Sequence, residues 1–217
     1  MSSLTTTLDW AIKYRPTSID DVILPKQIEK RLRAFSRNSG GLSVLFHGSP
    51  GCGKTTVAKL INPENTYFIN CTINNSIEDI RQLERTCSSL TLTGKRRLVL
   101  LDEADYLSKE AQAALRGLTE DFAVANDFVM TANYPERLID AIRSRFLSIN
   151  FEFMDSEEMR ERLIVFLGDV AVKEGFQRPS SAVLKTIIKR SFPDIRNMLK
   201  ALQFELLELE AANDLVN

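Results

Sequence analysis

The chain has 217 residues, a length that suggests one large domain or a core with a small second unit. Its 44% hydrophobic and 26% charged residues are typical of a globular protein and exclude disordered and collagen-like chains. The formal net charge of −1 argues against bulk-charge coating of nucleic acid, so any such contact must come from a local patch. The apolar runs are too short to span a membrane, and the polar N-terminus lacks the pattern of a secretory signal peptide. We therefore expect a cytoplasmic protein.

Short apolar runs alternate with longer amphipathic stretches in the first part of the chain, a pattern typical of a parallel sheet flanked by helices. The expected strands lie near residues 42–46, 67–70, 98–101, 127–131 and 147–151. The expected helices cover residues 55–61, 76–89 and 108–120, after a first one that begins near Lys26. That first helix carries Ile28, Leu32 and Phe35 on one face. The first part is therefore predicted to be α/β.

The strand pattern does not return after Asp155. Three amphipathic runs follow instead, at residues 155–174, 180–191 and 194–212, and they predict a small all-helical unit. Pro193 and Asp194 separate the last two helices, because proline tolerates a first helical turn and aspartate can cap it. We therefore expect a core at residues 1–152 and a helical lid at residues 153–217.

Residues 48–55 form a Gly-rich loop directly after an expected strand and directly before an expected helix. The loop satisfies the complete phosphate-binding pattern, through Gly48, Ser49, Pro50, Gly51, Cys52, Gly53, Lys54 and Thr55. In such a loop backbone N–H groups converge on phosphates, the lysine reaches the β and γ phosphates, and the hydroxyl binds Mg²⁺. Thr56 can add a contact at the helix start. The alternative, a Gly/Pro turn that happens to precede Lys-Thr, does not explain the flanking strand and helix. The loop predicts binding of ATP with Mg²⁺.

Two carboxylates, Asp102 and Glu103, follow the apolar run at residues 98–101. Parallel strands deliver their C-terminal residues to one edge of the sheet, where the phosphate loop also lies. Asp102 is therefore predicted to hold the metal shell, and Glu103 to polarise the attacking water. A solvated acidic loop would explain one carboxylate but not this pairing. Asp105 is expected to cap or pair nearby, without a catalytic role.

The cysteines Cys52, Cys71 and Cys87 are too few and too widely spaced for a disulfide framework or a zinc site. We interpret them as reduced and structural. A catalytic role for Cys52 is the weaker alternative, because in a phosphate loop its backbone N–H matters more than its thiol.

Motifs beyond the phosphate loop resemble the clamp-loader branch of the AAA+ ATPases. They are Trp-Ala-Ile-Lys-Tyr-Arg-Pro at residues 10–16, Ile-Asp-Asp-Val-Ile at 19–23, Leu-Asp-Glu-Ala-Asp at 101–105 and Ser-Arg-Phe at 144–146. Residues 13–16, 23–25 and 192–196 are most similar to the clamp-loader ATPase subunit of T4-like bacteriophages. The resemblance implies a P-loop AAA+ core with a five-stranded parallel sheet and a helical lid. It further implies a motor subunit that uses ATP to load a sliding clamp on primer–template DNA during replication, within a pentamer of clamp-loader subunits. For a viral protein the compartment would be the host cytoplasm.

The resemblance also implies residue roles around the nucleotide. The adenine would be bordered by Ala11, Ile12, Lys13, Tyr14, Arg15 and Ile23. From the residues alone, aromatic and branched side chains in an extended segment before Pro16 suit a flat base, but core packing explains them equally well. Asn133 resembles the sensor that orients the hydrolytic water, and Arg196 resembles a second sensor on the lid. A lone helical arginine is usually a solvated charge, so Arg196 rests on the resemblance.

Ser144-Arg145-Phe146 resembles the Ser-Arg-Cys box of the family, whose arginine enters the active site of the neighbouring subunit. Such an arginine neutralises charge as the γ-phosphate leaves. Phe146 replaces the usual cysteine, a change that leaves the guanidinium in place. Arg145 is therefore the predicted finger, and Arg143 is the nearby alternative.

Contacts to DNA are implied at Arg81 and, less directly, at Arg85 and Arg116, while residues 90–97 would face the clamp. Solvated helix charges are the alternative explanation. The helix after the phosphate loop is predicted to stop at Asn62 and Pro63, sooner than in the family. Family members also continue into a helical collar, which is absent from the expected organisation. Two other functions therefore stay open: another AAA+ DNA-remodelling ATPase, or a collar-less nucleotide-binding module without loading activity.

Overall fold

The computed structural model describes residues 9–37, 43–89, 95–152 and 156–214. Contacts divide the chain into two compact units. One is Ser18–Glu152, and the other combines Met1–Thr17 with Phe153–Asn217. The sequence analysis placed residues 9–17 with the sheet, whereas their contacts group them with the helices.

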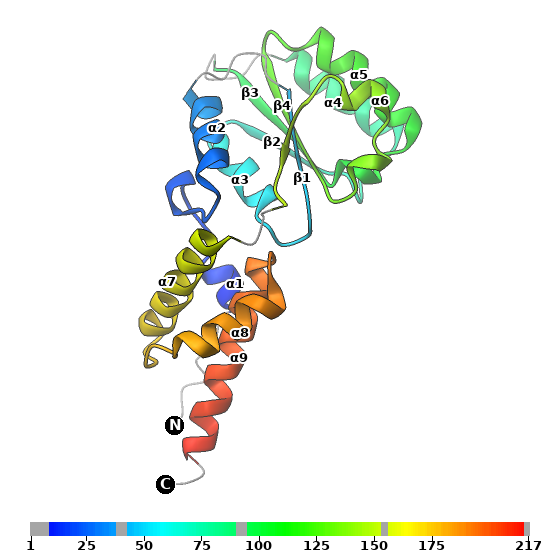
Figure 1. Ribbon diagram of the computed structural model, residues 1–217. Coiled ribbons are helices and arrows are strands. Elements are labelled where there is room, and N and C mark those ends of the chain that lie inside the picture. The colour runs from blue at the N-terminus through cyan, green and yellow to red at the C-terminus, as the bar shows by residue number, and fades with distance from the viewer. Residues whose placement is uncertain (1–8, 38–42, 90–94, 153–155, 215–217) are drawn as a thin grey trace, which may run out of the picture. The chain divides into compact units, whose positions relative to one another are not determined.

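The larger unit contains a five-stranded parallel sheet in the order β2-β3-β4-β1-β5 (Figure 1). Its strands are β1 (Ser43–His47), β2 (Thr66–Asn70), β3 (Arg97–Asp102), β4 (Asn126–Ala132) and β5 (Leu147–Asn150). The predicted parallel sheet is thus confirmed, because buried parallel strands are near-continuous apolar runs that a sequence displays plainly. The register pairs His47 with Ala132 and Asn70 with Asp102. The carboxyl ends of these strands therefore share one edge.

Helices cover both faces of this sheet, α2 and α3 on one side and α4, α5 and α6 on the other (Figure 1). They are α2 (Lys26–Arg37), α3 (Lys54–Ile61), α4 (Ile77–Ser88), α5 (Lys109–Asp121) and α6 (Asp140–Arg143), with 3₁₀ turns η1 (Ile19–Asp21), η2 (Ala104–Tyr106) and η3 (Pro135–Arg137). Ser76 begins α4 with a capping box to Asp79, and the Ser108 hydroxyl caps α5. The end of α3 at Ile61 agrees with the predicted stop.

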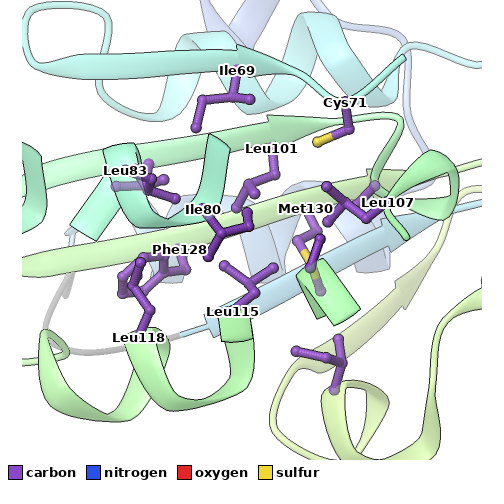
Figure 2. Packing of buried hydrophobic residues seen from close by; sticks show 14 of the residues in the cluster. Ile69, Cys71, Ile80, Leu83, Leu101, Leu107, Leu115, Leu118, Phe128 and Met130 are labelled. Carbon is purple, nitrogen blue, oxygen red and sulfur yellow. The ribbon is translucent and has the colours of Figure 1, made fainter. Parts of the chain in front are cut away.

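A hydrophobic core lies between the sheet and the pair α4 and α5. Figure 2 shows side chains from these elements converging, among them Ile80, Leu83, Leu101, Leu115, Leu118, Phe128 and Met130. Burying one such side chain stabilises the fold by about 1.5–3 kcal/mol. This core fixes β3, β4 and α5 against one another, and these three elements carry most of the site described below.

Gly117 in the interior of α5 offers a test of helix stability. A Cβ built there meets no heavy atom of the surrounding structure within 4 Å. Gly117→Ala is therefore expected to raise the free energy of unfolding by about 0.5–1 kcal/mol, because alanine loses less conformational freedom in a helix. Urea denaturation measures the difference.

A matched control for Gly117 is Gly168 in the second unit, where a Cβ would clash with the Arg178 guanidinium. Gly168→Ala should gain less than Gly117→Ala, or lose stability, because Arg178 must move. A loss of stability in Gly117→Ala would contradict the expectation for α5.

The smaller unit is helical. It contains α1 (Trp10–Lys13), α7 (Glu157–Lys173), α8 (Ser181–Ser191) and α9 (Ile195–Asp214). The three long helices match the runs predicted from the sequence. No helix among the described residues is both long and apolar enough to cross a membrane.

The segment before Pro16 differs from the sequence prediction. It was expected to be extended, but Trp10–Lys13 forms one helical turn, whose N-terminus is capped by the Asp9 carboxylate at 2.8 Å from the Ala11 N–H. Proline restricts mainly the residue directly before it, so the helical turn can form upstream. Trp10 is buried, and its ring packs edge-on against Phe176 at 5.9 Å. Core packing therefore explains Trp10.

Two side chains of the same segment bind one acidic residue at the end of α7. The Glu174 carboxylate accepts hydrogen bonds from the Lys13 ammonium and the Tyr14 hydroxyl. Burial and this hydrogen bond raise the pKa of Tyr14 to about 12. The N-terminal segment is thus fastened to the helical unit.

Candidate functional site

The Gly-rich loop joins β1 to α3, as the sequence predicted. Its glycines Gly48, Gly51 and Gly53 have φ angles of 139°, 77° and 95°, values that favour glycine. At Gly48 a Cβ would lie 2.9 Å from the backbone nitrogen of Glu152, which follows β5, so a side chain there would clash. No side chain caps the first turn of α3. Its N–H groups and helix dipole therefore suit an anion such as a phosphate.

Lys54 is buried at the start of α3, with 7% of its surface exposed. Its ammonium donates to the carbonyl oxygens of Gly48 and Ser49 at 2.7 and 2.8 Å. The charge is thus held inside the loop that the sequence predicts to surround phosphate groups. A phosphate oxygen is a stronger acceptor for it than a neutral carbonyl oxygen.

Burial shifts the pKa of two groups beside Lys54. It raises the pKa of the Cys52 thiol, an effect that Lys54 partly opposes. It lowers the pKa of His47, where Glu152 acts in the opposite direction. A buried, protonated thiol agrees with the structural role predicted for Cys52.

Asp102 at the end of β3 accepts hydrogen bonds from two hydroxyl groups. Its Oδ1 accepts hydrogen bonds from the Thr55 hydroxyl at 2.6 Å and from the Thr131 hydroxyl at 2.7 Å. The structure thus brings together Thr55 and Asp102, the two residues predicted to bind the metal. Hard cations such as Mg²⁺ take oxygen ligands, and this carboxylate and hydroxyl fit that preference.

Thr131 is a residue of the candidate site to which the sequence reasoning gave no role of its own. Besides its bond to Asp102, its Oγ1 accepts the backbone N–H of Glu103 at 2.9 Å. It therefore ties β4 to Asp102 at the end of β3 and to Glu103 in the turn that follows. The available signal was a hydroxyl residue near the end of a strand whose residues are all buried.

Glu103 has a left-handed backbone, with φ 56° and ψ 48°. A non-glycine residue in this region is uncommon, and such strain clusters at functional sites. The bond from its N–H to Thr131 helps to hold it there. This geometry supports a functional role for Glu103.

Asp105 connects the turn that carries Glu103 to the loop that carries Asn133. It is 5% exposed, and its two carboxylate oxygens accept the N–H groups of Asn133 at 3.3 Å and of Tyr134 at 3.1 Å. The expected local pairing of Asp105 is thus observed. The structure places Asn133 at the same sheet edge as Asp102 and Glu103.

Gln112 is a second residue that the sequence reasoning missed. It is almost fully buried on α5, and its amide nitrogen donates to the carbonyl oxygens of Leu107 and Arg137 at 3.0 and 3.3 Å. Its amide oxygen accepts the N–H of Ile139 at 2.7 Å. A glutamine on the buried face of an amphipathic helix was the available signal.

The two candidate finger arginines have different surroundings. Arg145 forms an ion pair with Glu120 of α5 and donates to the Ala141 carbonyl oxygen at 2.7 Å. Arg143 pairs with Asp140 of its own helix. Phe146, which replaces the cysteine of the family motif, is 5% exposed within the core cluster.

The three arginines predicted to contact DNA, Arg81, Arg85 and Arg116, are all exposed. Arg81 lies 3.6 Å from Glu78 on α4. These positions suit a contact with phosphates but equally suit solvated charges, so the DNA contacts stay predictions.

The loop predicted to face the clamp lies partly outside the described residues, because residues 90–94 are not among them. At its end Arg96 pairs with Asp127 and donates to the carbonyl oxygens of Ala123 and Asn126, each at 2.7 Å. Arg96 is thus a structural residue that fastens the turn before β4.

The residues predicted to surround the rest of the nucleotide belong to different units. Ile23 is half-buried in the sheet unit with the Gly-rich loop. The helical unit carries Arg196, exposed in the first turn of α9, together with Ala11, Ile12, Lys13, Tyr14 and Arg15. Their nucleotide contacts stay predictions.

A parallel sheet with a complete phosphate loop and a carboxylate pair at the same edge defines a P-loop nucleoside triphosphatase. Residues 44–153 match the AAA family, the ATPase family associated with various cellular activities. The chain is 34% identical over 220 residues to replication factor C small subunit 2 of Pyrobaculum islandicum, covering 96% of this chain and 67% of that protein. It is 35% identical over 206 residues to replication factor C small subunit 1 of Pyrobaculum arsenaticum, covering 90% and 61%. The chain therefore belongs to the replication factor C small subunit family of AAA ATPases.

Solved structures agree on the fold. The Holliday junction branch migration motor RuvB of Thermotoga maritima is similar with a TM-score of 0.70 and 24% identity, covering 88% of this chain and 64% of that one. At this identity the likeness concerns the fold alone. The chain spans 61% to 67% of the length of the two replication factor C relatives.

Proposed function

We propose that this chain is the ATPase motor subunit of a clamp loader, which uses ATP and Mg²⁺ to open a sliding clamp and load it on primer–template DNA during replication. The observation that carries the proposal is the hydrogen bond from the Thr55 hydroxyl of the phosphate loop to the Asp102 carboxylate. It occurs in a chain that is 34% identical to a replication factor C small subunit. Its partners would be the clamp, the DNA and further clamp-loader subunits. The resemblance of residues 192–196 to T4-like phage subunits extends the proposal to a phage protein in the host cytoplasm.

The loop and its surroundings would bind the triphosphate. The Lys54 ammonium would exchange the carbonyl oxygens of Gly48 and Ser49 for β and γ phosphate oxygens, a change from neutral to charged acceptors. Thr55 and Asp102 would hold Mg²⁺, which when bound neutralises charge on the phosphates. N–H groups of the loop and of α3, including that of Thr56, would complete the cradle.

The turn after β3 would perform the hydrolysis. Glu103 would accept the proton of the attacking water as the water oxygen bonds to the γ-phosphorus and the bond to the β-phosphate oxygen breaks. Asn133 would orient that water, with its backbone fixed by Asp105. Arg196 and the segment Ala11 to Arg15 would contact the nucleotide from the helical unit, together with Ile23.

Arg145 provides the experiment that tests this proposal. In the assembled loader, Arg145 of one subunit would stabilise the γ-phosphate transferred in its neighbour. Arg145→Ala should therefore lower the ATP turnover stimulated by clamp and primed DNA by about 1,000-fold or more, because arginine fingers contribute on this scale. Steady-state phosphate release, with and without clamp and primed DNA, measures the effect, and a filter-binding assay follows ATP affinity.

The matched control is Arg143→Ala, which removes a more exposed arginine two residues away and should keep the stimulated rate. If primed DNA and clamp do not raise the ATP turnover of the wild-type chain, the clamp-loader proposal is overturned. Stimulation by a branched junction instead would favour a branch-migration ATPase, and ATP binding without any stimulation would favour a nucleotide-binding module.

A further inference from the structure

The guanidinium of Arg145 is held by two different elements of the fold. Glu120, in the last turn of α5, pairs with its Nε, and Ala141 of α6 accepts a hydrogen bond from its Nη1 at 2.7 Å. Within the described part of the chain, Nη2 donates to no protein group. The side chain of Arg145 is 29% exposed. Two of the three guanidinium nitrogens are thus fixed by the protein, and Nη2 is left available to donate to a further acceptor.

Arg143 shows that this arrangement is not general for the segment. Among the described residues its side chain pairs with Asp140, three positions earlier on the same short helix, and it is 44% exposed. Glu120, in contrast, is 25 residues from Arg145 in sequence and reaches it only because α5 packs beside α6. The fold therefore supplies a separate carboxylate for one of the two arginines.

The ion pair between Arg145 and Glu120 contributes little to the stability of the fold. Glu120 is 53% exposed, and ion pairs in contact with water contribute little to folding. An arginine side chain samples many rotamers, and it loses conformational entropy when it is ordered in one of them to bind a phosphate. A carboxylate that fixes one rotamer beforehand removes that entropic cost from the transition state.

We propose that Glu120 is a positioning residue for the Arg145 finger, which holds the Nε side so that the Nη2 end meets the γ-phosphate bound by a neighbouring subunit. The inference rests on the proposed function, in which Arg145 acts in the neighbouring site. Glu120 lies on α5, four positions after Arg116, so the helix that would contact DNA would also orient the finger. Glu120 itself would touch neither nucleotide nor Mg²⁺.

The test compares Glu120→Ala with Glu120→Gln in the ATPase assay with clamp and primed DNA. Glu120→Ala is expected to lower the stimulated kcat by about 10-fold, with KM for ATP and the melting temperature unchanged. Glu120→Gln keeps an oxygen acceptor for the Nε–H and should retain at least about half of the rate. Asp140→Ala, which removes the partner of Arg143, is the matched control and should behave as wild type.

The double variant of Glu120 and Arg145 distinguishes a positioning role of Glu120 from a general effect of its charge. In an Arg145→Ala background, Glu120→Ala should cause no further loss, because its effect acts through Arg145. An unchanged or raised rate in Glu120→Ala, or an equal further loss without Arg145, would overturn the inference. If Arg145→Ala lowers the rate while Glu120→Ala does not, only the positioning role fails. If Arg145→Ala is itself without effect, the trans finger fails first and the inference fails with it.

Discussion

Glu103→Gln is expected to bind ATP normally and to hydrolyse it at least about 100-fold more slowly. The amide keeps the size of the side chain but cannot take the proton of the attacking water, and general bases contribute on this scale. Glu103 stands next to Asp102 in a strained left-handed conformation, with its backbone N–H bonded to Thr131. Single-turnover hydrolysis and equilibrium binding of a fluorescent ATP analogue measure the two quantities separately.

Glu110→Gln is the matched control for Glu103→Gln. Glu110 is an exposed carboxylate in the first turn of α5, seven positions later in the chain, and its loss should leave turnover unchanged. A Glu103→Gln variant with the wild-type rate would show that another group serves as the base.

Lys54→Met is expected to lower the affinity for ATP by at least about 100-fold, with little loss of stability in the nucleotide-free chain. Charge-assisted hydrogen bonds contribute about 1.5–3 kcal/mol each, and this ammonium would bind two phosphates. The partners of this buried charge in the protein are neutral, namely the carbonyl oxygens of Gly48 and Ser49 and the Cys52 sulfur, so its removal also relieves a desolvation cost. Isothermal titration calorimetry gives the affinity, and thermal unfolding gives the stability.

Lys59 on the same helix provides the control for Lys54. Its ammonium lies 4.1 Å from the centre of the Phe68 ring, at the exposed side of α3. Lys59→Met should keep ATP affinity and change stability by no more than about 1 kcal/mol, the scale of an exposed cation–π contact. A loss of affinity equal to that of Lys54→Met would mean that general positive charge, rather than the loop lysine, attracts the nucleotide.

Much of the fold could be predicted because its signals are local. Each buried parallel strand is one short apolar run, and the long helices show apolar periodicity and capping residues such as Ser76 and Ser108. The elements that were missed are short. The helices α1 and α6 have four residues each, less than two turns, and so present no periodic pattern.

The candidate site divides in the same way. The phosphate loop and the pair Asp102 and Glu103 are contiguous motifs, so the sequence by itself determined them and the ATPase class they indicate. Thr131, Gln112 and Glu120 left almost no signal, because their partners lie 25 or more residues away in most of their contacts. Hydrogen bonds of this kind exist only after packing has brought β3, β4, α5 and α6 together. The sequence thus determined which groups can bind a nucleotide, and the tertiary structure decided which residues hold those groups in place, because orientation depends on neighbours that are distant along the chain.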